Sequence, residues 1–170
     1  MGAGKSTVGG LVADLLDFEL VDTDKAIEER QHRRVADIFA EQGEPAFRAL
    51  EAALVQELGT TEGRVIATGG GLPMNPESFA ALKRHSFVAC LWASAETVFQ
   101  RVRYQSHRPL LHAPDPLARI RELLEQRRPV YRQADLLVGV DYRAPIESAR
   151  YIVGAFRQAA GRTLPRHAVR

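Results

Sequence analysis

The chain has 170 residues, a length that corresponds to about one domain. Hydrophobic residues make up 45% and charged residues 26%, a balance that is ordinary for a globular protein and excludes a disordered chain. No apolar run approaches the ~20 residues of a transmembrane helix, and we expect no signal peptide. The single Cys90 excludes an internal disulfide and fits a reducing compartment, so we expect a cytoplasmic protein.

The formal net charge is only +2, but the 23 basic residues comprise 20 Arg and 3 Lys. Arginine suits forked contacts with phosphate or carboxylate groups. The basic segment 101–132 is explained equally well by such contacts and by an Arg-rich composition with solvated helix faces. Nucleic acid is a weaker candidate for a partner, because the total charge is low.

The first part of the chain predicts short strands that alternate with helices. Apolar residues recur at helical spacing from Ser6 to Leu16, and the segment 18–21 is typical of a strand. The same reasoning predicts helices over 25–33, from 35 to a stop at Gly43, and over 44–58. A strand over 64–68 then runs into three consecutive glycines.

The second part continues the alternation. Helices are expected over 76–84, 96–104, 117–126 and 145–160, and strands over 87–92 and 134–140. The segment 105–116 is a loop rich in Pro and His, and we expect it to be a mobile lid. We therefore expect a single domain over 1–160 and a flexible tail over 161–170.

This order of elements predicts an α/β fold with a parallel β-sheet covered by helices on both faces. Ligands of such sheets bind at the carboxyl ends of the strands. Polar clusters occupy those positions here, because Asp22-Thr-Asp24 follows one predicted strand and Gly69-Gly70-Gly71 follows the next.

The N-terminal segment resembles a phosphate-binding loop. The pattern G-x-x-x-x-G-K-[ST] follows a strand, and Gly4, Lys5 and Ser6 match its last three positions. Neither the first Gly of the pattern nor the strand lies within the sequence. Glycines let backbone N–H groups turn onto phosphate oxygens, Lys5 offers a charge and Ser6 a hydroxyl for Mg²⁺. The alternative is a Gly-rich terminal tail without a ligand.

The Asp22-Thr-Asp24 segment has two interpretations. One carboxylate could hold Mg²⁺ through water while the other orients or deprotonates an acceptor hydroxyl. Alternatively, one aspartate caps the helix that begins near Lys25, and capping does not exclude the first role.

Six motifs together resemble the shikimate kinase family, which has the nucleoside-monophosphate-kinase-like P-loop fold. They occur in the order of that family: GAGKST from Gly2 to Thr7, Asp22-Thr-Asp24, the segment 38–51 with Phe39, Phe47, Arg48 and Glu51, Gly69-Gly70-Gly71, Arg108-Pro-Leu-Leu111, and Arg127-Arg-Pro-Val-Tyr131.

The resemblance implies a role for individual residues. Asp24 would bind the shikimate hydroxyls and act as the base, Asp22 and Ser6 would hold Mg²⁺, and Glu51 would hold Arg48 in place. The shikimate-binding set would be Asp24, Arg48, Gly69, Gly70, Gly71 and Arg127, with Phe39 and Phe47 as walls. The ATP-binding set would be Gly2, Ala3, Gly4, Lys5, Ser6, Thr7, Arg101 and Arg108. Lys5, Asp24 and Arg108 would be catalytic.

The implied activity is ATP-dependent phosphorylation of the 3-hydroxyl of shikimate, with Mg²⁺. We expect a monomer that acts on these small molecules and has no nucleic-acid or membrane partner. The alternatives are a related kinase for gluconate, a nucleotide or aminoshikimate, or a non-catalytic shikimate-binding protein.

The incomplete phosphate loop leads to a further expectation. In the resembled fold the strand before this loop is central in the sheet, so its absence would leave a gap of about 10 Å between its neighbours. Unpaired backbone groups there would cost about 1–3 kcal/mol each. We therefore expect the 170-residue chain to be poorly stable and a weak kinase.

Overall fold

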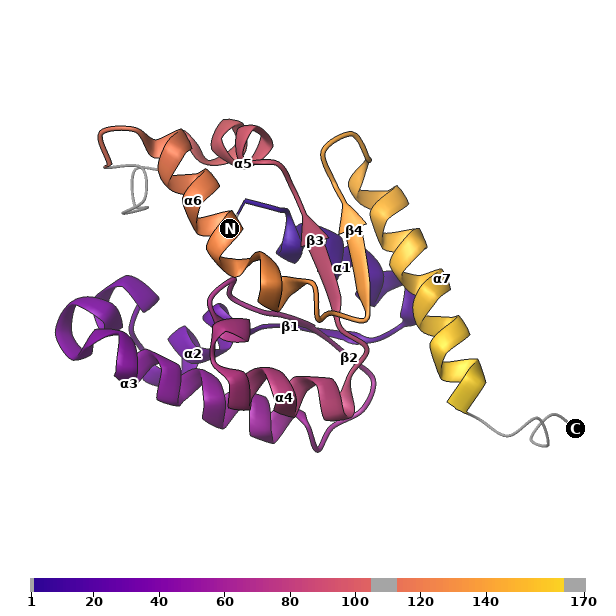
Figure 1. Ribbon diagram of the computed structural model, residues 1–170. Coiled ribbons are helices and arrows are strands. Elements are labelled where there is room, and N and C mark those ends of the chain that lie inside the picture. Colours follow the sequence, from indigo (N-terminus) through magenta and orange to yellow (C-terminus); the bar gives the residue numbers. More distant parts are fainter. Residues whose placement is uncertain (1, 105–112, 164–170) are drawn as a thin grey trace, which may run out of the picture.

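The computed structural model describes residues 2–104 and 113–163, in which helices alternate with short strands (Figure 1). The elements are α1 (Lys5–Leu16), β1 (Glu19–Asp22), α2 (Thr23–Gln31), α3 (Val35–Leu58), β2 (Arg64–Ala67), the 3₁₀ turn η1 (Leu72–Met74), α4 (Pro76–His85), β3 (Ala89–Trp92), α5 (Ala95–Val102), α6 (Pro116–Tyr131), β4 (Leu136–Gly139) and α7 (Pro145–Thr163).

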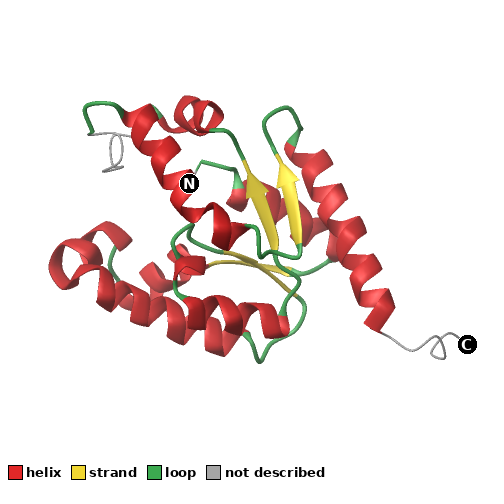
Figure 2. Ribbon diagram, viewed as in Figure 1, coloured by secondary structure: helices red, strands yellow, loops and turns green. Residues whose placement is uncertain are grey.

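The four strands of the described residues form two parallel pairs (Figure 2). β1 pairs with β2, from Glu19 opposite Arg64 to Asp22 opposite Ala67. β3 pairs with β4, from Ala89 opposite Leu136 to Trp92 opposite Gly139. Within the described residues the two pairs are not hydrogen-bonded to each other, and a cavity of about 460 Å³ is lined by both β2 and β3. The predicted parallel α/β arrangement is confirmed, although the strands do not form one continuous sheet.

Helices α1 and α3 cover opposite faces of the β1–β2 pair. Gly9 brings α1 close to the strands, since a Cβ there would lie 3.3 Å from Leu20 and 3.6 Å from Ala67. The neighbouring residues Val21 and Ile66 instead pack against the core that contains Leu54 and Leu58 of α3, as expected where successive side chains of a strand face opposite ways.

A second core surrounds the β3–β4 pair. Its fully buried members include Val98 and Val102 of α5, Ile120 of α6 and Val138 of β4. In Figure 1, α7 runs beside β4 on the right of the molecule. None of the helices in the described part of the chain is long and apolar enough to cross a membrane.

Most element boundaries agree with the sequence predictions, but two helices are longer. The expected stop at Gly43 is a break inside α3, where φ is 79° and ψ is 173°. Helix α6 continues beyond the expected end at 126 to Tyr131 and includes Pro129. Helix α7 reaches Thr163 and so includes the first residues of the segment expected as a tail, whereas residues 164–170 lie outside the described residues and the flexible tail stays a prediction. Gly161 lowers helix stability by only ~1 kcal/mol relative to Ala, which does not stop a packed helix.

Candidate active site

The loop before α1 presents backbone N–H groups at a helix N-terminus. Gly2 (φ 64°) and Gly4 (φ 85°) both adopt left-handed conformations that residues with a side chain rarely adopt. Gly4 caps α1, and its carbonyl accepts a hydrogen bond of 2.9 Å from the N–H of Val8. Ser6 and Thr7 lie exposed in the first turn. This geometry favours an anion at the start of α1.

Ser6 and Asp22 meet at the end of β1. The Ser6 hydroxyl donates a hydrogen bond of 2.7 Å to Oδ2 of Asp22. The other oxygen of Asp22 accepts from the N–H groups of Asp24 (3.2 Å) and Lys25 (3.4 Å) and so caps α2. Hydroxyl and carboxylate oxygens are the hard donors that Mg²⁺ takes alongside phosphates and waters, so these two residues fit that ion.

The Asp24 carboxyl group lies close to the glycine turn that follows β2. A Cβ on Gly69 would stand only 3.0 Å from Oδ1 of Asp24. Burial and the charge of Asp22 raise the pKa of Asp24 above its ordinary value, and the charge of Lys5 acts in the opposite direction. The phosphate loop and Asp24 are therefore electrostatically linked.

Thr23 connects the start of α2 to the same turn. It is fully buried, and its hydroxyl accepts a hydrogen bond of 3.2 Å from the N–H of Gly69. The hydroxyl also donates to the carbonyl of Ala67, at 3.4 Å. This buried hydroxyl thus holds the end of β2 in place beside Asp24.

Helix α3 supplies an arginine held by two glutamates. Nε and Nη2 of Arg48 donate to Oε1 of Glu44, at 3.1 and 2.7 Å, and Nη1 donates to Oε2 of Glu51. Glu51 is only 1% exposed, and burial raises its pKa even though Arg48 lowers it. A Cβ on Gly71 would collide with the Arg48 guanidinium, which therefore lies against the glycine turn.

The second oxygen of Glu51 faces the site. Oε1 has no hydrogen-bond partner among the described residues, and it would lie 3.2 Å from a Cβ on Gly69. A buried acceptor without a partner is rare in folded proteins, so this oxygen is available to a donor on a bound molecule.

Helix α6 contacts the glycine turn from another side. Nη1 of Arg127 donates to the carbonyl of Gly70 at 3.2 Å, and the Tyr131 hydroxyl donates to the same oxygen at 2.6 Å. Burial raises the pKa of Tyr131, so the phenol keeps its proton. Arg48 and Arg127 therefore reach consecutive glycines from two different helices.

Two aromatic rings lie beside Arg48. The centroids of Phe39 and Phe47 are 4.8 Å apart, and Cζ of Arg48 lies 5.5 Å from the centroid of the Phe47 ring. The site therefore combines two guanidinium groups, two carboxylates and a backbone turn without side chains next to a phosphate loop. Such a set can bind a small anion that carries hydroxyl groups and place a hydroxyl near Asp24.

Comparison with known proteins agrees with this geometry. A family model described as shikimate kinase matches residues 1–157. The chain belongs to the shikimate kinase family. It is 41% identical over 162 residues to a shikimate kinase of Caldanaerobacter subterraneus subsp. tengcongensis, a match that covers 95% of both chains. A shikimate kinase of Hahella chejuensis is 40% identical over 167 residues, or 98% of this chain and 87% of the relative.

A solved structure of the family has the same fold. The shikimate kinase of Acinetobacter baumannii in complex with shikimate superposes with a TM-score of 0.87 at 33% identity, over 97% of this chain and 91% of that one. As a member of the shikimate kinase family, this protein is an enzyme of the shikimate pathway that uses ATP.

The structure brings most of the residues expected from the resemblance together. Arg101 lies at the edge of the phosphate loop, where its guanidinium donates to the carbonyls of Gly2 (3.3 Å) and Val140 (3.0 Å). Arg108 lies outside the described residues, as do residues 105–112 of the expected lid, so these two expectations stay predictions. Residues 113–116 of the expected lid are described, and the last of them, Pro116, is the first residue of α6.

Three contributors were not predicted as site residues. Thr23 lies between the two predicted aspartates, and Tyr131 ends a quoted motif, so both were within reach of a motif-based argument. Glu44, which binds Arg48, lies in the segment 38–51, but its position four residues earlier on α3 is typical of any surface ion pair.

Proposed function

We propose that this shikimate kinase family member transfers the γ-phosphoryl group of ATP to the 3-hydroxyl of shikimate. The observation that carries the proposal is the position of Arg48 and Arg127, which contact Gly71 and Gly70 beside Asp24. This arrangement provides forked donors for one carboxylate and an acceptor for hydroxyl groups at the same turn.

The acceptor would bind with its carboxylate between the two guanidinium groups and its ring over the glycine turn. Gly69 to Gly71 have no side chain, so the ring can approach the backbone closely. Glu44 and Glu51 hold the fork of Arg48 in one orientation, which reduces the entropy that binding must remove.

The phosphates of ATP would bind where α1 begins. The N–H groups of the loop and the ammonium group of Lys5 would neutralise phosphate charge. Ser6 and Asp22 would hold Mg²⁺, which supplies further charge neutralisation when bound. Arg101 would steady the loop through its hydrogen bond to Gly2.

In the transfer, the acceptor oxygen forms a bond to the γ-phosphorus while the bond between that phosphorus and the oxygen bridging to ADP breaks. The proton of the hydroxyl passes to Asp24. Its raised pKa brings this carboxylate closer to the operating pH and makes it a better base than an ordinary aspartate.

Calorimetry with separate titrations of shikimate and of ATP with Mg²⁺, followed by detection of shikimate 3-phosphate, tests the proposal. We expect heat from both titrations and product when both are present. Heat from shikimate alone, without nucleotide binding, would instead identify a binding protein.

The Arg127→Lys substitution tests the carboxylate clamp. It keeps the charge but removes the fork, so we expect shikimate binding to weaken by about 1.5–3 kcal/mol. Arg132→Lys changes an exposed arginine one turn further along and serves as the control, with no expected change in affinity. Equal affinities of both variants and the parent protein would contradict the clamp.

A further inference from the structure

The carbonyl groups of the glycine turn after β2 find their hydrogen-bond partners in different places. The carbonyl of Gly69 accepts from the N–H of Leu72 at 3.3 Å, and that of Gly71 accepts from the N–H of Met74 at 2.9 Å. Among the described residues, only side chains of α6 donate to the carbonyl of Gly70. The pairing of this oxygen therefore depends on another element of the fold.

Two side chains that lie one helical turn apart on α6 share this oxygen. The Tyr131 hydroxyl donates to it at 2.6 Å, and Nη1 of Arg127 donates at 3.2 Å. A carbonyl oxygen has two lone pairs, so it can accept both bonds. The tyrosine bond is near the short end of the usual range and the arginine bond is at the long end of its own. Tyr131 is therefore the closer partner of Gly70.

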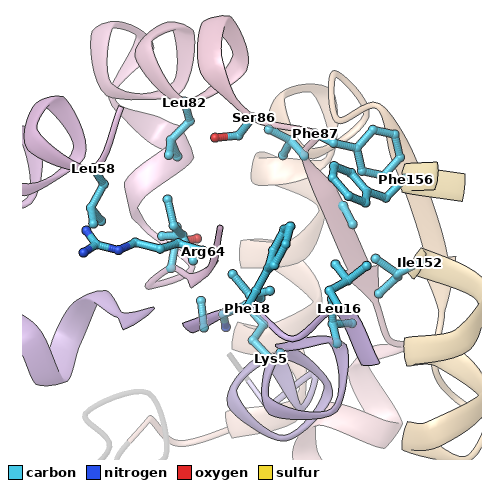
Figure 3. A pocket seen from close by; sticks show the side chains of 18 of the residues that line it. Lys5, Leu16, Phe18, Leu58, Arg64, Leu82, Ser86, Phe87, Ile152 and Phe156 are labelled. Atoms are coloured by element: carbon cyan, nitrogen blue, oxygen red, sulfur yellow. The ribbon is translucent and has the colours of Figure 1, made fainter. Parts of the chain in front are cut away.

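The Tyr131 hydroxyl is a lasting donor at this place. Burial raises the pKa of Tyr131, so the phenol keeps its proton at neutral pH. Thr68 and Pro73 flank the glycine turn in the sequence and line a cavity whose walls are mostly apolar. Figure 3 shows Leu82 and Phe87 among these walls. Such side chains cannot donate a hydrogen bond in place of the phenol.

The two arginines of the carboxylate clamp are held to different degrees. Arg48 donates three hydrogen bonds to Glu44 and Glu51, and Glu51 is only 1% exposed. Arg127 pairs with no carboxylate of the described residues, and its guanidinium is tied to the backbone by the single bond of 3.2 Å. A bound carboxylate therefore meets one fixed guanidinium and one that can turn toward it.

We infer that Tyr131 is a positioning residue that lets Arg127 turn from Gly70 to the carboxylate of the acceptor. When Arg127 leaves, the hydroxyl of Tyr131 still pairs with the Gly70 carbonyl, so the turn keeps its shape. Without this hydroxyl, binding of a carboxylate would leave the carbonyl unpaired and would lower the affinity. The inference rests on the proposed function, since it takes the carboxylate of shikimate as the ligand of Arg127.

Calorimetry with two ligands tests this role. Tyr131→Phe keeps the ring and removes the hydroxyl. The probes are shikimate and its neutral analogue with a hydroxymethyl group in place of the carboxylate, the latter measured by competition with shikimate. We expect the Kd of shikimate to rise about tenfold. The Kd of the analogue should change by less than twofold, because a neutral group does not draw Arg127 away from Gly70.

Tyr151→Phe is the matched control for this substitution. Tyr151 lies on α7 and is 50% exposed, so we expect both Kd values to stay as in the parent protein. Equal weakening of shikimate and of the analogue by Tyr131→Phe would overturn the inference, because the tyrosine would then only support the turn. An unchanged Kd of shikimate in Tyr131→Phe would overturn it as well.

A double-mutant cycle of thermal melts tests the shared carbonyl without a ligand. Tyr131→Phe and Arg127→Met each leave one donor on Gly70, whereas the double variant leaves none. We therefore expect the Tm of the double variant to fall by more than the sum of the two single changes, and additive changes would overturn the inference. A parent protein that binds no shikimate would instead contradict the proposed function, and the cycle alone would then decide whether the two side chains share Gly70.

Discussion

Gly69 determines how closely the backbone of the β2 turn approaches two carboxylates. A Cβ at this position would lie 3.0 Å from Asp24 and 3.2 Å from Glu51, distances that require one of the carboxylates to move. We expect Gly69→Ala to lower kcat/KM for shikimate by tenfold or more, which corresponds to ~1.4 kcal/mol of transition-state stabilisation.

Gly154→Ala is the matched control for this substitution. Gly154 lies exposed in α7, and a Cβ there meets open space. Steady-state kinetics should show an unchanged kcat/KM for this variant. If Gly69→Ala is equally active, the turn does not need its close approach to Asp24.

Asp24, the proposed general base, also affects stability through its pKa. Burial and the neighbouring Asp22 raise that pKa, so the folded protein binds this proton more tightly than the unfolded chain does. Stability from this group is present at pH values below the ordinary carboxyl pKa and is lost as the pH rises through the raised pKa. We therefore expect Asp24→Asn, which resembles the protonated form, to raise Tm at neutral pH.

The same variant should lose at least ~10²-fold in kcat, the lower range for a general base. In the parent protein, kcat/KM should fall as the pH drops through the raised pKa of Asp24. The Tm difference between variant and parent should shrink as the pH falls below the ordinary carboxyl pKa of about 3.9, because the Asp24 side chain is then neutral in the folded and the unfolded protein. If Asp24→Asn melts below the parent protein at neutral pH, the assigned upward shift of the Asp24 pKa is contradicted.

The sequence indicated candidate residues for the site but not how those residues contact one another. Asp22 shows why, since its carboxylate both caps α2 and accepts from Ser6, and the sequence offered these as separate interpretations. The contact of Arg48 with the glycine turn depends on how α3 packs across the β1–β2 pair. Spacing along one chain segment carries no information about that packing.

At the scale of elements, Thr23 ties α2 to the end of β2. Thr23→Val keeps the shape but leaves the N–H of Gly69 and the carbonyl of Ala67 without this partner. Unpaired buried groups cost about 1–3 kcal/mol each, so we expect a loss of about 2 kcal/mol in the free energy of unfolding. Thermal melts should then show a Tm lower by about 4–8 °C.

The glycine turn should also loosen in this variant, which should raise KM for shikimate. Thr23→Ser retains the hydroxyl and should restore most of the affinity for shikimate. If Ser and Val behave alike in KM, the hydrogen bonds of Thr23 do not position the turn.

Helix α3 illustrates which features of an element are visible in the sequence. Its apolar positions recur at helical spacing, and Gly43 marks the break because a positive φ there suits glycine. The position at which α6 ends was not predictable from the sequence, because a proline such as Pro129 normally disfavours the interior of a helix. Packing of Arg127 and Tyr131 on Gly70 accompanies this extension of the helix.

At the scale of the whole molecule, the alternation of elements predicted parallel strands, whereas the partner of each strand was not predictable from local patterns. β1 pairs with β2 across α2 and α3, and β3 pairs with β4 across α5 and α6. These pairings depend on contacts between distant segments, which leave little trace in the periodicity of a single segment.

Phe156 connects the two strand pairs, because its ring packs against Phe18 before β1 and against Phe87 before β3. Phe156→Ala should therefore remove contacts to both halves of the molecule. This half-buried side chain buries less area than a phenylalanine in the core. We therefore expect Phe156→Ala to lower the free energy of unfolding by about 2 kcal/mol, below the usual 3–5 kcal/mol for Phe→Ala. The expected decrease in Tm is about 4–8 °C.

Tyr151→Ala, in the same helix, is the control because that ring is 50% exposed and should contribute within about 0.5 kcal/mol. Trp92 lies on β3, so its fluorescence reports the β3–β4 pair, whereas circular dichroism reports all helices. If Phe156 couples the pairs, the fluorescence and dichroism transitions of Phe156→Ala should separate, while those of Tyr151→Ala should coincide. Helices α1 and α7 also pack directly against each other. Coincident transitions in both variants, with equal Tm, would show that this packing holds the pairs together without the aromatic cluster.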